Sequence, residues 1–351
     1  MNTMITAADN EIMNQTVSDS QTLVTGVYRS GTEFFTMELA GHPELSSTMY
    51  HINAMRWVLG RYDPISDEKN VVRAIADVAE RVAKRYSIEF DRAAVLSAYR
   101  DSDRRGYGHL YDVLVSQLWL EGKRRHWAEK NQLVWREIPQ FLEMMPNGRA
   151  IMVIRDPRSV LASTRRWTYA PPPAYLGAAF NCLDAMRAAK RYSEELPADR
   201  FLVMRYEDFA RDIASNRARV YAFLQLDTAA FDPANRRHVG SYGEAWTANT
   251  AFDRPNEGFD VEAAIWRWKT SLEEYETAFV EFVCADLLEA FGYTPSDAKM
   301  DWPRLLKSAL GDTSITAWLR QFLETGEGVQ AFPRDPIDPA NWGEGRGGIK
   351  Q

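Results

Sequence analysis

The chain has 351 residues, of which 45% are hydrophobic and 26% are charged, the ordinary composition of a folded globular protein. Its formal net charge of −7 argues against a broad surface for nucleic acid or for an anionic membrane, because both need an excess of Lys and Arg. The two cysteines, Cys182 and Cys284, have neither metal-ligand spacing nor a disulfide framework, which favours a reducing compartment. We therefore expect a cytoplasmic protein without nucleic-acid or membrane partners. The sequence leaves its oligomeric state open.

The first ordered unit is predicted to be a strand, a glycine turn and a helix. Residues 1–20 carry no apolar periodicity and are expected to form a flexible tail. A β-prone run at residues 22–25 then ends in Gly26, and helical character extends over residues 33–39. The connecting residues 26–32 place Gly26 and Gly31 at the G-x-x-x-x-G spacing of a phosphate loop. In this position backbone N–H groups and the helix N-terminus can bind an anion.

The residues around the second glycine do not fit a nucleoside triphosphatase. Such a loop continues with a Lys for the β- and γ-phosphates and a Ser or Thr for Mg²⁺. Here the continuation is Thr32 and Glu33, and a cation, Arg29, lies inside the loop instead. A nucleotide kinase-like enzyme therefore becomes the weaker alternative, and the main reason to expect a metal is removed.

The rest of the chain alternates strands and helices. Two further strands are predicted at residues 150–154 and 201–204, and the first of them is a continuous apolar run typical of a strand buried on both faces. Helices are predicted at residues 67–86, 107–121, 132–145, 157–166, 214–225, 261–270 and 273–291. This order predicts a three-layer α/β fold, with a central, mostly parallel sheet flanked by helices and the phosphate loop after the first strand. We expect one domain over residues 21–295 and a partly irregular C-terminal extension over residues 296–351.

Two signatures follow one another along the chain. The first is Tyr28-Arg29-Ser30-Gly31-Thr32 after the first strand. The second is an apolar strand that ends in Arg155-Asp156-Pro157-Arg158, with Ser163 eight residues after Arg155. Together they resemble the bacterial type of sulfotransferase that uses 3′-phosphoadenosine-5′-phosphosulfate (PAPS). The resemblance implies that residues 28–32 bind the 5′-phosphosulfate and that Arg155 and Ser163 bind the 3′-phosphate of PAPS. A guanidinium is well suited to such a phosphate contact.

Two aromatic residues are assigned to the adenine by the same resemblance. Tyr206 belongs to an Arg-Tyr-Glu-Asp segment after a strand, similar to a family segment whose Tyr lies near the adenine. Phe34 falls where family members often place an aromatic ring against the base. For Phe34, a place in the core of the first helix is almost equally favoured.

The catalytic cations and the base are assigned by resemblance as well. Arg29 is expected to stabilise the leaving phosphate. Lys130 is the second cation, because Glu129-Lys130 matches the start of a family (Asp/Glu)-Lys-(Thr/Ser)-Pro segment. This chain differs from that segment in the next two residues, which are Asn131 and Gln132. The acceptor needs a general base. His51 is the first candidate, because it follows a stretch similar to one that precedes the base in a family branch, and its pKa needs no large shift. His126 and Glu129 are the reserve candidates.

The predicted function is transfer of the sulfuryl group from PAPS to a hydroxyl or amine of a small-molecule or carbohydrate acceptor, without a metal and with 3′-phosphoadenosine 5′-phosphate (PAP) as the product. One alternative is a catalytically altered protein of this fold that only binds PAPS. Another is sulfonation that activates a hydroxyl for elimination. The aromatic, proline-rich residues 167–173 are predicted to line the acceptor pocket or to form a packed linker.

Overall fold

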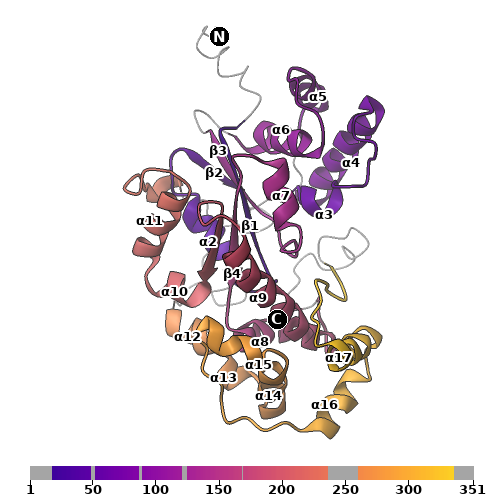
Figure 1. Ribbon diagram of the computed structural model, residues 1–351, viewed down its shortest axis with the longest axis vertical. Coiled ribbons are helices and arrows are strands. Elements are labelled where there is room, and N and C mark those ends of the chain that lie inside the picture. The colour runs from indigo at the N-terminus through magenta and orange to yellow at the C-terminus, as the bar shows by residue number, and fades with distance from the viewer. Residues whose placement is uncertain are drawn as a thin grey trace.

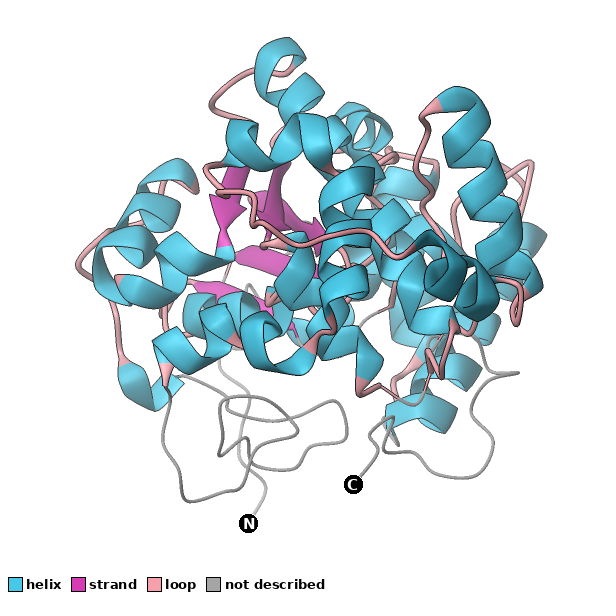
Figure 2. Ribbon diagram, turned by 90° about the horizontal axis from the view of Figure 1, so that it is seen from below, coloured by secondary structure: helices cyan, strands magenta, loops and turns pink. Residues whose placement is uncertain are grey.

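A five-stranded sheet lies at the centre of the computed structural model, with helices around it (Figures 1 and 2). The structure describes residues 18–48, 52–86, 89–120, 125–167, 169–235 and 260–335. The strands are β1 (Ser20–Gly26), β2 (Leu45–Thr48), β3 (His126–Lys130), β4 (Arg149–Ile154) and β5 (Phe201–Arg205). Their spatial order is β2-β3-β1-β4-β5, and all four pairings are parallel. The predicted α/β fold with a parallel sheet is confirmed.

The helices of the described residues are α2 (Thr32–Leu39), α3 (Ala54–Trp57), α4 (Glu68–Tyr86), α5 (Arg92–Arg100), α6 (Tyr107–Trp119), α7 (Ile138–Met144), α8 (Pro157–Arg165), α9 (Gly177–Glu195), α10 (Tyr206–Arg211), α11 (Ile213–Phe223), α12 (Val261–Trp266), α13 (Trp268–Ser271), α14 (Glu274–Val283), α15 (Ala285–Leu288), α16 (Trp302–Ala309) and α17 (Thr313–Thr325). Short 3-10 turns lie at Ala174–Leu176, Pro233–Asn235 and Glu289–Phe291.

Each central strand contributes to two hydrophobic layers, because successive side chains of a strand point to opposite faces. In β1, Leu23 packs in the layer that contains α6, α7 and α9, whereas Val24 packs in the layer that contains α2, α10 and α11. In β4, Met152 and Val153 divide in the same way. Figure 1 shows α2 and α11 on one side of the sheet and α6 and α7 on the other. Burial on both faces explains the continuous apolar run of β4.

One helix prediction was wrong in its first half. The segment 132–145 was expected to be helical throughout, but α7 begins only at Ile138. Leu133 has a left-handed φ of 57°, which is incompatible with a continuous helix, and its N–H donates to the carbonyl of Gly26 at 3.3 Å. Residues 131–133 therefore run past the end of β1 in a non-helical conformation before α7 begins.

The sequence also missed two strands. β2 is short and polar, and β3 reads His-Trp-Ala-Glu-Lys, which has little apolar content. β3 forms because it pairs with β1, with His126 to Lys130 in register with Ser20 to Val24, and β2 pairs in turn with β3.

Candidate active site

The carboxyl ends of three neighbouring strands meet at one edge of the sheet and form the candidate site. β1 occupies the middle of the sheet, and its carboxyl end runs into the glycine loop of residues 26–31. β3 and β4 lie on either side of β1 and end at Lys130 and Ile154, directly before Arg155. In a parallel sheet of this kind, the connections after neighbouring strands turn to opposite sides of the sheet. This creates a crevice at the carboxyl edge, where ligands of α/β proteins bind.

The glycine loop needs its second glycine for two reasons. Gly31 has a left-handed φ of 92°, and a Cβ at this position would lie 2.3 Å from Cδ2 of Tyr206. The ring of Tyr206 therefore packs directly on the backbone of the loop. Arg29 also has a left-handed φ, of 71°, and the N–H of Ser30 closes the turn by donating to the carbonyl of Val27 at 3.1 Å. These contacts hold the loop in a fixed shape before α2 begins.

Arg29, Arg155 and Ser163, which belong to the two sequence signatures, lie close together. Nε of Arg29 donates to Oγ of Ser163 at 3.1 Å. One Nη of Arg155 donates to the carbonyl of Arg29 at 3.0 Å, and the other donates to the carbonyl of Ala264 at 2.7 Å. Ser163 reaches this point because α8 starts immediately after β4, where the Asp156 side chain accepts from an N–H of the first helical turn.

The positive charge at this position is concentrated. Burial is the largest effect that lowers the pKa of Arg29 to about 10, and the nearby guanidinium groups of Arg155, Arg267 and Arg166 lower it further, against the opposite effect of Glu33. In the part of the chain that the structure describes, the buried Nε of Arg155 and Oγ of Ser30 have no hydrogen-bond partner. An anion with several oxygen atoms would satisfy both groups and offset the repulsion among the cations. The loop therefore fits a phosphate or a sulfate ester.

Lys130 lies at the same edge but is already paired. Its Nζ lies 2.8 Å from Oε1 of Glu33, and its side chain is 1% exposed. The ammonium of Lys130 lowers the pKa of Glu33, although burial of the carboxyl acts in the opposite direction. Glu33 thus takes the place of a metal-binding hydroxyl in sequence and serves as the counter-ion of Lys130. Nε2 of Gln132 also reaches this region and donates to Oγ1 of Thr32 at 3.0 Å.

The three candidate bases lie in different environments. His51 is outside the described residues. His126 lies at the amino end of β3, four residues before Lys130, which places it about 13 Å from the site edge at the rise of a strand. This position makes His126 unsuitable as a base.

Glu129 points to the sheet face opposite Lys130 and is fully buried. Its Oε1 accepts from the backbone N–H groups of Ile52 and Asn53 at 2.5 and 3.1 Å, and its Oε2 accepts from the hydroxyl of Tyr111. Burial raises the pKa of Glu129 to about 7. The carboxylate holds the start of α3, directly after His51.

The two residues assigned to the adenine are neighbours. The rings of Phe34 and Tyr206 are 6.2 Å apart, and the guanidinium carbon of Arg155 lies 4.4 Å from the centroid of Tyr206. Phe34 is 8% exposed and also packs on Phe209, so it belongs to the core layer of α2 and α10. Tyr206 links that layer to the glycine loop.

Sequence reasoning did not find Arg166, Arg267 or the role of Glu33. Arg267 lies between α12 and α13. Arg155 donates to the carbonyl of Ala264 in α12, so this part of the chain returns to the edge where the phosphate loop lies. The guanidinium of Arg267 there lowers the pKa of Arg29. No local pattern could have announced this, since the two residues are far apart in the sequence.

Comparison with known families decides the identity. The model of the sulfotransferase family matches residues 22–230, more than half of the chain. The chain belongs to the sulfotransferase family. The matched region contains the glycine loop, Lys130, Arg155, Ser163 and Tyr206. Comparison with curated proteins gave no significant match.

Solved structures of sulfotransferases share the fold. The sulfotransferase domain of the Synechococcus PCC 7002 olefin synthase has a TM-score of 0.50 and 18% identity, over 84% of this chain and 99% of that domain. The sulfotransferase domain of the curacin biosynthetic pathway has the same TM-score and identity, over 78% of this chain and 98% of that domain. These similarities show that the chain has the same fold as these domains.

Two features are absent from the residues that the structure describes. No cluster of three or more His, Cys, Asp or Glu side chains in these parts of the chain is arranged to hold a metal ion. Within the same residues, no helix has the length and apolar character required to cross a membrane.

Proposed function

We propose that this sulfotransferase moves the sulfuryl group of PAPS to a hydroxyl or amine of a small-molecule or carbohydrate acceptor, with PAP as the second product. The observation that supports this most is the convergence of Arg29, Arg155 and Ser163 beside a glycine loop that has unsatisfied buried donors. PAPS carries phosphate oxygens at the 3′ and 5′ positions of its ribose. The site offers two cationic groups to bind them, Arg29 after β1 and Arg155 after β4.

In the proposed reaction, the acceptor oxygen or nitrogen attacks sulfur in line with the bond to the 5′-phosphate. A bond from the acceptor to sulfur forms, the bond from sulfur to the phosphate oxygen breaks, and a base takes the acceptor proton. Charge builds up on the leaving phosphate, so a fixed cation there lowers the barrier. Arg29 is assigned this role because its position is fixed by Ser163 and by the loop. Lys130 supplies a second cation from the end of β3.

The site residues fit PAPS without assigning a role to a metal. Residues 28–32 would hold the 5′-phosphosulfate, and Arg155 with Ser163 would hold the 3′-phosphate. Tyr206 and Phe34 would contact the adenine. His51 remains the proposed base. Glu129 holds the backbone N–H groups of Ile52 and Asn53, the two residues that follow His51 in the sequence.

The test is calorimetry of the full chain with PAP, followed by transfer of labelled sulfate from PAPS to a panel of hydroxyl and amine acceptors. Micromolar binding of PAP together with a labelled sulfate ester or sulfamate supports the proposal. Binding without transfer to any acceptor indicates the altered binding protein, and an alkene product indicates sulfonation followed by elimination. Mg²⁺-dependent turnover of ATP without PAP binding would contradict the proposal and favour a kinase-like enzyme.

A further inference from the structure

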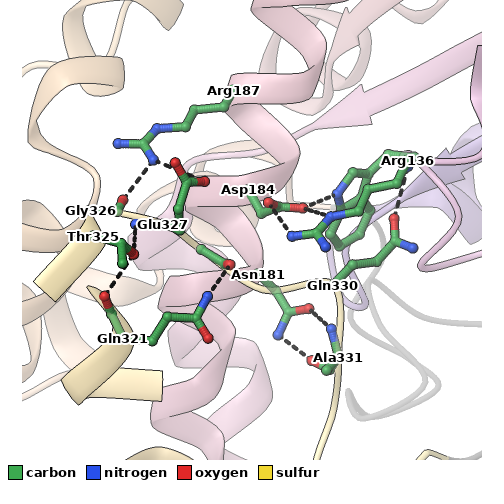
Figure 3. A network of polar contacts seen from close by, with 12 residues as sticks. Arg136, Asn181, Asp184, Arg187, Gln321, Thr325, Gly326, Glu327, Gln330 and Ala331 are labelled. Carbon is green, nitrogen blue, oxygen red and sulfur yellow. Dashed lines mark hydrogen bonds and ion pairs between the residues drawn. The ribbon is translucent and has the colours of Figure 1, made fainter. Parts of the chain in front are cut away.

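Residues 326–335, here called the strap, follow the end of α17. Figure 3 shows the first part of the strap, from Gly326 to Ala331, beside α9. Arg187 of α9 donates to the carbonyl of Gly326 at 2.6 Å, and the N–H of Val329 donates to the carbonyl of Phe180 at 3.2 Å. The N–H of Ala331 donates to Oδ1 of Asn181 at 2.9 Å. Hydrogen bonds from the backbone of the strap to residues between Phe180 and Arg187 therefore hold it against α9, although the strap contains no helix or strand.

Two further residues fix the course of the strap. Gly328 lies against α9 so closely that a Cβ would be 2.5 Å from the carbonyl oxygen of Phe180. The amide of Gln330 donates to both carboxylate oxygens of Glu137, at 3.0 and 2.9 Å, and its oxygen accepts from the N–H of Arg136 at 2.9 Å. Ordering each residue costs about 1–2 kcal/mol of backbone entropy. These contacts offset that cost, which distinguishes the strap from a free tail.

The end of the strap reaches the phosphate loop itself. The ring of Phe332 lies 5.2 Å from that of Tyr28 and 5.7 Å from that of Trp167, while Tyr28 and Trp167 are 5.0 Å apart. The hydroxyl of Tyr28 donates to Asp335 at 3.1 Å and accepts from Arg56 of α3 at 3.2 Å. Arg56 also forms an ion pair with Asp335.

The strap covers one side of the phosphate loop. Tyr28 directly precedes Arg29, so the strap contacts the loop on the side of Tyr28, whereas Tyr206 packs on the loop at Gly31. The side of Tyr206 is the proposed nucleotide side. The side of Tyr28, Trp167 and Phe332 is lined by three aromatic rings, which suit an apolar body better than a highly charged one.

We infer that the strap forms part of the acceptor site, with Phe332 and Asp335 as residues that select the acceptor by size and exclude water from the phosphate loop. The inference rests on the proposed function and concerns the same site. The acceptor class that fits is a hydroxyl carried by an apolar ring or chain, which packs on the rings of Trp167 and Phe332. The strap lies outside residues 22–230, which match the family model, so this wall is supplied by the chain beyond the matched region.

Three variants of the full chain test the inference. Phe332→Ala removes a ring beside Tyr28, and Asp335→Asn removes the charge that pairs with Arg56. Glu327→Gln is the matched control, because Glu327 is in the strap but its side chain is 61% exposed and its ion pair with Arg187 is long, at 3.8 Å. Each variant is measured for PAP affinity by calorimetry, for transfer from labelled PAPS to phenol and 2-naphthol, and for release of labelled sulfate from PAPS to water.

For Phe332→Ala we expect the ratio of kcat/KM for 2-naphthol to that for phenol to rise about tenfold, the scale for one altered apolar contact in a pocket. Release of sulfate to water is expected to rise at least about threefold in both Phe332→Ala and Asp335→Asn, as water gains access to the loop. PAP affinity should stay within about twofold of the wild type, and Glu327→Gln should match the wild type throughout. If the wild type sulfonates neither phenol nor 2-naphthol, the release of sulfate to water decides whether the strap shields the phosphate loop.

Three results would overturn the inference in distinguishable ways. An unchanged acceptor ratio and unchanged release of sulfate, with normal PAP binding, would refute the role of the strap and leave the proposed function intact. A parallel loss of PAP affinity and of all activities in Phe332→Ala and Asp335→Asn would show a purely structural role. Failure of the wild type to bind PAP would refute the proposed function, and the acceptor site with it.

Discussion

Nζ of Lys130 forms an ion pair with Oε1 of Glu33 at 2.8 Å, and this pair joins the end of β3 to the helix that follows the phosphate loop. The two residues are 97 positions apart in the sequence. Glu33 therefore fixes the position of a cation that a proposed sulfuryl transfer needs beside Arg29. The pair also explains how a Lys side chain can be almost fully buried in this fold, since a buried ammonium requires a partner.

Lys130→Met is expected to lower kcat for sulfuryl transfer about 10²-fold, because it removes one fixed charge from the position where charge develops. PAP affinity should change far less than kcat. The measurement is single-turnover transfer from labelled PAPS, with calorimetry of PAP as the control. Glu33→Gln keeps the cation and is expected to retain turnover within about tenfold of the wild type. Near-normal turnover of Lys130→Met would remove Lys130 from the reaction.

Arg155→Ala is expected to weaken PAP binding by about 1.5–3 kcal/mol, or about 10- to 150-fold, the range for hydrogen bonds to a charged group. Calorimetry of the purified variant measures the effect directly. Arg320→Ala is the matched control, since the Arg320 side chain is 80% exposed on α17. Unchanged PAP affinity in Arg155→Ala would contradict the assignment of the 3′-phosphate site.

His51→Ala is expected to reduce turnover about 10²-fold while PAP binding stays intact, if His51 removes the acceptor proton. The pH dependence of kcat/KM provides a second readout, because a histidine base gives an acidic limb near its pKa. Turnover close to that of the wild type would transfer the role to another group. Glu129 would then be the next residue to test.

Glu129→Gln is expected to change how stability depends on pH. The pKa of Glu129 is raised from 4.5 to about 7 by burial, so the folded state favours the protonated carboxyl. The stability that this group contributes is fully present below about pH 4.5 and is lost as the pH rises through 7. Relative to the Gln variant, the wild type should lose on the order of 3 kcal/mol of unfolding free energy between pH 4.5 and pH 8.

Urea unfolding of both proteins across this pH range measures that difference. Glu89→Gln, at an exposed carboxyl, is the control and is unfolded over the same pH range. A constant difference between wild type and Glu129→Gln across the range would show that the carboxyl is ionised throughout, held by the N–H groups of Ile52 and Asn53.

The sequence by itself determined the two units that carry the site signatures. β1, the glycine loop and α2 follow from local rules: an apolar run, a glycine that tolerates a positive φ, and helical spacing afterwards. β4 and α8 follow in the same way, since Asp156 caps the helix and Pro157 occupies its first turn. Residues that define such units are neighbours in the chain, so their chemistry can be recognised before the fold is known.

Only the tertiary structure decided what lies between and beyond those units. β3 contains Glu129 and Lys130, which no propensity places in a buried strand; they are tolerated because Tyr111 and Glu33 satisfy them from distant helices. The strap is a stronger case, since Tyr28 and Asp335 are 307 positions apart. Contacts of this kind depend on how separate elements pack, and the sequence pattern within one element holds no information about the side chain that will meet it from another.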